Sequence, residues 1–191
     1  TGVVEPVARY DMNDDSPLKL LVVGGSLGAR VLNDTVPKAL ALLERPFEVR
    51  HQCGRNNETA TQAAYAAEDL SAHQFTVQPF IDDMAAAYNW ADVIVCRAGA
   101  LTVTEIQNVG IAAIFVPLPH AVDDHQTANA RTLTSHEAAT LLPQSELTAQ
   151  RLSQELAALD RRTCLEMAKK GHALANRRAS MQVADIIWQT L

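Results

Sequence analysis

Short apolar runs alternate with amphipathic stretches along most of this 191-residue chain. Apolar runs predict strands at 18–23, 93–96, 113–116 and 139–142, and segments in which apolar and polar residues alternate predict strands at 47–52 and 75–78. The stretches between them predict helices, among them 58–69, 82–88, a helix from Thr102 and another over 123–133, and helical segments continue to Leu191. Strands that alternate with helices indicate an α/β fold. We expect a Rossmann-like, doubly wound parallel sheet of about six strands, with a ligand at their carboxyl ends.

The first seventeen residues differ from the rest. They hold Pro6, a polar run over 11–16 and Pro17, and the chain opens on Thr1 rather than Met. We predict a linker at 1–17 that leads into one domain at 18–191, and we expect an excised domain. A processed N-terminus is the alternative.

Composition narrows the function classes. The net charge of -6 and pI near 5.4 argue against nucleic-acid binding, which needs a basic face. The three cysteines are widely spaced and form no CxxC pair, which predicts neither a disulfide framework nor a zinc site and favours a cytoplasmic protein. No apolar run approaches the roughly 18 residues that cross a bilayer.

The segment 95–105 runs from a buried strand through a small-residue turn into a helix. Gly99 and Ala100 leave room for a ligand at the backbone, and the following amides lie at a helix N-terminus, where a diphosphate can bind. Glu105 is then placed to meet hydroxyl groups, which suggests a nucleotide sugar. Thr102 and Glu105 also fit a capping box, so helix capping is an equal alternative for this carboxylate.

A glycine turn, residues 24–28, follows the first strand, and its amides and the Ser26 hydroxyl are candidates for phosphate binding. The spacing is not GxGxxG, and His51 and Gln52 stand where a dinucleotide-binding protein carries an acidic residue. The match to an NAD site is therefore poor. A turn whose glycines serve packing alone is the alternative.

Two other strand ends carry candidate groups. Main-chain groups of Phe80 and Ile81 can bond a flat base, while Asp82 or Asp83 is most simply a helix N-cap. No DxD pair is present to hold a divalent ion, and the histidines at 120 and 125 do not match a metal pair on one helix face, so we predict no metal.

The polar loop that runs from 117 into the next helix carries the last group of candidates. His125, Gln126 and Asn129 are predicted to bond a hydroxyl-rich ligand, with ordinary polarity at a helix start as the alternative. No nucleophile motif is found.

Taken in order, these motifs resemble one family. The chain is similar to the C-terminal domain of the peptidoglycan GlcNAc transferases of the MurG family, two-domain GT-B enzymes, over about 2–191. The residues that carry the resemblance are 24–30 with Leu32 and Asn33, 51–54, 80–84, 91–92, 97–102 with Glu105 and Ile106, and 125–126 with Asn129 and Ala130.

The resemblance assigns the donor UDP-GlcNAc to this domain. It implies that Ser26 contacts a phosphate, that main-chain groups at Ile81 read uracil, and that Glu105 binds the ribose. By the same resemblance, amides of Ala100, Leu101 and Thr102 line the sugar and diphosphate, and Gln126 holds GlcNAc. Further candidate contacts are Arg9, Gly25, Phe80, Gly99, His125 and Asn129.

The resemblance also implies the reaction: inverting transfer of GlcNAc from UDP-GlcNAc to lipid I, which forms lipid II without a cofactor. The general base and the lipid I site are expected on an absent N-terminal domain, so we predict no catalytic residue here and a chain that binds UDP-GlcNAc or UDP but is inactive alone. The parent enzyme is expected to be peripheral on the cytoplasmic face of the inner membrane. Alternatives are half of a UDP-GlcNAc epimerase, an NAD-dependent oxidoreductase, or a non-catalytic interaction domain.

Overall fold

The computed structural model describes residues 10–12, 14–119 and 124–175, so Arg9 lies outside the described residues. The elements in chain order are β1 (Leu18–Val23), α2 (Arg30–Leu40), β2 (Phe47–Gln52), α3 (Glu58–Ala66), β3 (Gln74–Gln78), α4 (Met84–Trp90), β4 (Val93–Cys96), α5 (Ala100–Val109), β5 (Ala112–Phe115), α6 (His125–Thr134), β6 (Ala139–Leu141), the 3-10 helix η2 (Gln144–Glu146), α7 (Ala149–Ala157) and α8 (Arg161–Ala173).

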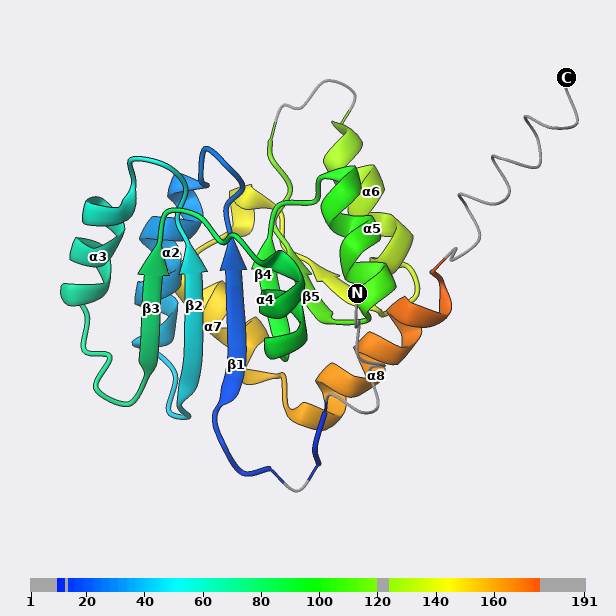
Figure 1. Cartoon of the computed structure of the whole chain (residues 1–191), viewed down its shortest axis with the longest axis horizontal. Coiled ribbons are helices and arrows are strands. Elements are labelled where there is room, and N and C mark those ends of the chain that lie inside the picture. Colours follow the sequence, from blue (N-terminus) through cyan, green and yellow to red (C-terminus); the bar gives the residue numbers. More distant parts are fainter. Residues whose placement is uncertain (1–9, 13, 120–123, 176–191) are drawn as a thin grey trace, which may run out of the picture.

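The six strands form one sheet in the order β3-β2-β1-β4-β5-β6, and every neighbouring pair is parallel. All strands therefore end at the same edge, which is the upper edge in Figure 1. The order reverses between β1 and β4, where a doubly wound sheet opens a crevice for ligands. The expected α/β architecture is confirmed.

Side chains that alternate along the strands build two cores. On β1, Leu20 and Val22 join the core that α2, α3 and α7 cover, whereas Leu21 joins the core under α4, α5 and α6. On β4, Val95 joins the first of these cores and Ile94 joins the second. Because both faces of the central strands are buried, these strands read as continuous apolar runs in the sequence.

One predicted detail of the helices is wrong. Helix α5 begins at Ala100 rather than at Thr102, with Gly99 as its N-cap. Helix α2 continues through Pro37, whose carbonyl accepts a hydrogen bond from the Ala41 N–H at 3.1 Å. The buried side chains of Val36 and Ala39 hold the helix on the sheet although Pro37 removes one of its hydrogen bonds.

The described part of the predicted linker is attached to α8. Arg161 Nη1 donates to the Ser16 carbonyl at 2.9 Å, and Nη2 lies 3.2 Å from Asp14 Oδ2. The Tyr10 hydroxyl donates to the Asp92 carbonyl. These contacts lie before β1, at the edge of the sheet opposite the strand ends.

The three cysteines are buried free thiols. Burial raises the pKa of all three, that of Cys164 to about 12, because desolvation disfavours the thiolate.

Candidate functional site

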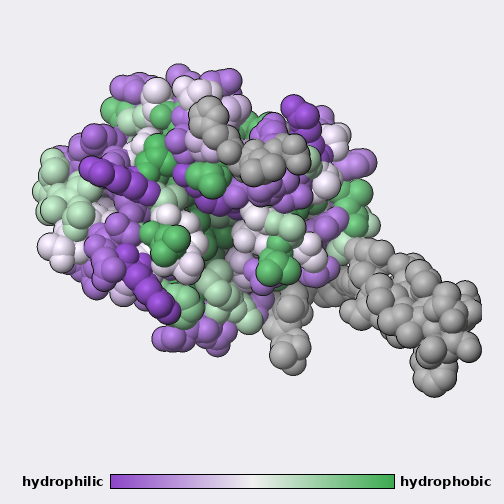
Figure 2. Space-filling model, turned by 90° about the horizontal axis from the view of Figure 1, so that it is seen from above, coloured by the Kyte–Doolittle hydropathy of each residue, from purple (hydrophilic) through white to green (hydrophobic). Residues whose placement is uncertain are grey.

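The loops that follow β1, β3, β4 and β5 meet at the carboxyl edge of the sheet. Figure 2 looks down on this edge and shows apolar groups around a hollow between polar margins. Large apolar side chains are exposed at this edge, namely Leu27, Phe80 and Leu118 in the loops and Leu101 in the first turn of α5. Exposed apolar groups gathered at one edge indicate a surface that a ligand or another part of the protein covers.

In the glycine turn, Gly28 packs closely against a neighbouring loop, whereas Gly25 faces open space. A Cβ on Gly28, at φ +78°, would lie 2.1 Å from the Cys53 carbonyl oxygen, so this residue allows the turn to pack on the loop after β2. Gly25, at φ +85°, would meet nothing within 4 Å. The turn is closed by the Gly28 N–H, which donates to the Gly25 carbonyl at 2.9 Å, and Ser26 at its tip is exposed.

The N-terminus of α5 presents, at the same edge, amides that form no hydrogen bond with any described residue. The first helical hydrogen bond runs from the Val103 N–H to the Gly99 carbonyl at 2.9 Å, so the amides of Ala100, Leu101 and Thr102 precede it. A Cβ on Gly99 would meet only the Thr102 hydroxyl, at 3.7 Å. Open space beside unpaired amides and the positive end of a helix suits an anion.

Glu105 does not cap its helix. Because α5 begins at Ala100, Glu105 lies in the second turn, and the predicted capping box with Thr102 is not formed. Instead, Glu105 Oε2 accepts a 2.8 Å hydrogen bond from the hydroxyl of Tyr88 on α4. The Tyr88 side chain is buried, and burial together with this bond to Glu105 raises the pKa of the Tyr88 hydroxyl. Glu105 itself is exposed, and among the described residues Tyr88 is its one hydrogen-bond partner.

The segment after β3 keeps its backbone available. Among the described residues, the main-chain groups of Phe80 and Ile81 enter no hydrogen bond. The Ile81 side chain is buried, which anchors the segment, while Phe80 is half exposed. Asp83 Oδ1 accepts from the Ala86 N–H at 2.8 Å, which confirms that Asp83 is the N-cap of α4.

At the start of α6, two predicted contact residues are already partly engaged. Gln126 Oε1 accepts a 2.9 Å hydrogen bond from the Leu118 N–H, so Nε2 is the group that can donate to a sugar hydroxyl. Asn129 Nδ2 donates to the Ala98 carbonyl at 3.1 Å and thereby ties α6 to the residue before Gly99. His125 is the exposed first residue of α6, whereas His120 lies outside the described residues.

Two side chains that join the loops of this edge are absent from the predicted site. Gln52, at the end of β2, bonds both the glycine turn and Pro79. Arg97, after β4, donates from Nη1 to the carbonyls of Val116 and Pro117, both at 3.0 Å. A polar residue at the buried end of a strand is the only sequence signal of either role.

Comparison with known proteins identifies the family of this chain. The family described as glycosyltransferase family 28 C-terminal domain matches residues 19–187. The chain belongs to that family.

Full-length relatives extend the likeness. A protein of Psychrobacter arcticus named UDP-N-acetylglucosamine--N-acetylmuramyl-(pentapeptide) pyrophosphoryl-undecaprenol N-acetylglucosamine transferase is 83% identical over 191 residues, which are 100% of this chain and 53% of the relative. A protein of the same name from Aeromonas hydrophila is 57% identical over 88% of this chain and 46% of its own length. The crystal structure of Acinetobacter baumannii MurG matches with a TM-score of 0.91 at 48% identity, over 96% of this chain and 53% of that one. The chain thus spans about half the length of these relatives.

A buried polar cluster joins α2, β2 and α3 in this glycosyltransferase domain. His51 Nε2 lies 3.0 Å from Asn33 Oδ1, and His51 Nδ1 lies 2.9 Å from the Tyr65 hydroxyl. Asn33 Nδ2 donates to the Cys53 carbonyl, which orients Oδ1 toward His51 and indicates a neutral imidazole with its proton on Nε2. Burial lowers the pKa of His51 to about 3.

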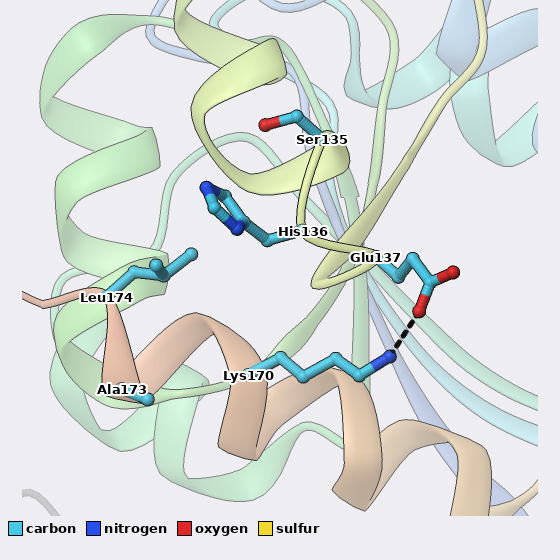
Figure 3. A pocket seen from close by; sticks show the side chains of 6 residues that line it. All are labelled: Ser135, His136, Glu137, Lys170, Ala173 and Leu174. Atoms are coloured by element: carbon cyan, nitrogen blue, oxygen red, sulfur yellow. Dashed lines mark hydrogen bonds and ion pairs between the residues drawn. The ribbon is translucent and has the colours of Figure 1, made fainter.

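A pocket of 420 Å³ lies at the opposite edge, between the turn after α6 and the end of α8. Figure 3 shows Lys170 reaching Glu137, with Nζ and Oε2 2.6 Å apart, while His136 and Leu174 line the other side. This pocket is lined by none of the residues predicted to contact the donor. Among the described residues no group of three His, Cys, Asp or Glu side chains could hold a metal ion, and no helix is long and apolar enough to cross a membrane.

Proposed function

We propose that this chain is the donor-binding half of the glycosyltransferase that transfers GlcNAc from UDP-GlcNAc to lipid I and so forms lipid II, with inversion at the anomeric carbon. One observation carries the proposal: the free amides of α5, the open glycine turn and Glu105 share the carboxyl edge of one sheet at its topological switch point. The family membership and the printed names of the full-length relatives support it.

Each strand end then has a part in holding the donor. Main-chain groups of Ile81 read uracil, and the side chain of Phe80 packs beside the base. Glu105 accepts hydrogen bonds from the ribose hydroxyls, and Gln126 donates to GlcNAc. The diphosphate lies between the glycine turn, with Ser26 and Gly25, and the amides that follow Gly99. Asn129 supports Gly99 through Ala98, so its contribution to binding is indirect.

The chemistry of this half is stabilisation of the leaving group. When the C4 hydroxyl of the acceptor attacks the anomeric carbon, negative charge grows on the departing UDP. Fixed amides and the α5 dipole are already aimed at that charge and need no rearrangement in the transition state. The general base and the lipid I site belong to the N-terminal half of the parent enzyme, which 1–17 would join to this domain. Membrane contact on the cytoplasmic face is assigned to the parent enzyme.

Titration calorimetry of the 191-residue chain with UDP-GlcNAc, UDP and NAD tests the proposal. We expect saturable binding of both uridine ligands, in EDTA as in buffer with Mg²⁺, and no binding of NAD. NAD binding with indifference to UDP would select an oxidoreductase, and failure of all three ligands would favour an interaction domain. Transfer to lipid I by this chain alone would contradict the assignment of the general base and the lipid I site to the N-terminal half.

A further inference from the structure

Gln52 occupies a central place beneath the proposed donor site. It is the last residue of β2, and β2 lies between β1 and β3 in the sheet. Its side chain therefore sits between the glycine turn that follows β1 and the segment 79–81 that follows β3. The residue is 3% exposed, so its carboxamide forms hydrogen bonds with the protein rather than with solvent.

The carboxamide of Gln52 is fully used by these two loops. Oε1 accepts from the Gly25 N–H at 3.1 Å, and Nε2 donates to the Gly25 carbonyl at 3.0 Å and to the Pro79 carbonyl at 2.9 Å. These partners fix the orientation of the amide, because two carbonyls require the amino group and one N–H requires the oxygen. No other side chain type supplies two donors and an acceptor at this reach.

The main chain around Gln52 reaches the same two loops. The Gly24 N–H donates to the Gln52 carbonyl at 3.2 Å, and the Cys53 N–H donates to the Gln78 carbonyl at 2.9 Å. These bonds stop short of Gly25, a residue with positive φ and free space around it. Within the turn the Gly25 carbonyl also accepts from the Gly28 N–H. The side chain of Gln52 adds the bonds that tie Gly25 to the segment after β3, and glycine is the residue type that most needs such a restraint.

We propose that Gln52 is a positioning residue that fixes the phosphate-binding turn relative to the base-reading segment before the donor arrives. The inference rests on the proposed donor site. A ligand that spans both loops, such as UDP, gains from their fixed relation, because the ordering of Gly25 does not have to be supplied on binding. Uridine needs only the loop after β3 and Glu105, so it gains little. Gln52 thus increases the affinity for UDP over that for uridine, because only UDP carries the diphosphate.

The test compares two ligands on two variants. Gln52→Met keeps the length of the side chain and removes its hydrogen bonds, and Gln52→Glu keeps the acceptor but loses both donors. Affinities of the 191-residue chain for UDP and uridine are measured by NMR titration at a temperature where thermal unfolding shows each protein to be folded. Asn33→Leu is the matched control, since it removes a buried side-chain amide that bonds Cys53 and His51 rather than Gly25 or Pro79.

We expect both Gln52 variants to bind UDP about tenfold more weakly while uridine affinity changes less than about twofold, and Asn33→Leu to keep the wild-type ratio. Equal losses for UDP and uridine, an unchanged UDP affinity, or the same loss in Asn33→Leu would each overturn the role of Gln52. Absence of UDP binding by the wild-type chain would instead overturn the proposed function, so the two failures are distinct.

Discussion

The hydroxyl of Tyr88 donates a 2.8 Å hydrogen bond to Oε2 of Glu105 and so joins α4 to α5. Tyr88 is buried and Glu105 is exposed, so a rigid group holds one carboxylate oxygen, while no other described residue bonds the second. This arrangement fits the proposed ribose contact, because a carboxylate that is already oriented loses less side-chain entropy when a ligand binds.

Tyr88→Phe is therefore expected to weaken UDP binding about threefold to tenfold, since it removes one hydrogen bond and keeps the ring. The preference for UDP over 2′-deoxy-UDP, measured by calorimetry, should fall with it. Tyr65→Phe is the control, because its hydroxyl contacts His51 away from the site and its loss should leave that preference intact. A preference that survives in Tyr88→Phe would separate Tyr88 from ribose binding.

Glu105→Ala should reduce UDP affinity by about 1–3 kcal/mol, the range for loss of a charge-assisted hydrogen bond. Chemical unfolding should show a loss of at most about 1 kcal/mol, from the hydrogen bond of Tyr88, because Glu105 is exposed and caps no helix. Asp160→Ala gives the opposite pattern: Asp160 Oδ1 accepts from the Thr163 N–H at the start of α8, so its loss should cost about 1 kcal/mol of stability without affecting UDP. Similar behaviour of the two variants would refute the distinction.

Gly28→Ala should destabilise the domain far more than Gly25→Ala. Both positions have positive φ, which costs an L-residue about 1–2 kcal/mol. At Gly28 the new methyl group would also collide with the Cys53 carbonyl, adding about 1–3 kcal/mol of overpacking. Urea unfolding measures both costs. Gly25→Ala, which meets no atoms, should instead show its main effect in UDP titration, and equal unfolding midpoints would contradict the packing role of Gly28.

Stability should fall as the pH drops below about 6.5, the ordinary pKa of histidine. The folded protein keeps His51 neutral down to about pH 3, so the unfolded chain binds more protons in this window and is favoured as pH falls. This group alone should cost about 2 kcal/mol at pH 5. Urea unfolding between pH 5 and 8 should give a shallower dependence in His51→Gln than in the wild type. The lowered pKa of His73 leaves a residual slope of the same sign in both proteins.

The sheet could be predicted from sequence because its central strands are buried on both faces. The bounds of β1 and β2 agree with the strands predicted at 18–23 and 47–52. The start of α5 was misplaced by two residues, since Ala100 and Leu101 suit a turn as well as a helix and Thr102 with Glu105 imitates a capping box. That local ambiguity makes helix capping and ligand binding equal alternatives for Glu105 in the sequence, and the start of α5 at Ala100 excludes capping.

The arrangement of the candidate site followed from one rule, that parallel strands end at a common edge. The supporting residues did not, because their partners are distant in sequence. Gln52 bonds Gly25 and Pro79, each 27 residues away on opposite sides, and nothing near Gln52 in the chain reports either contact. Likewise, the sequence could not assign packing to Gly28 and open space to Gly25, since both lie in the same turn.

The burial of all three thiols makes the domain a convenient background for site-specific labelling. Cys53, Cys96 and Cys164 are shielded, and their raised pKa values keep them protonated and slow to alkylate at neutral pH. A single cysteine introduced at the exposed Leu27 would therefore react selectively with a maleimide dye, without prior removal of the native thiols. Such a dye would stand on the glycine turn and report donor binding by fluorescence.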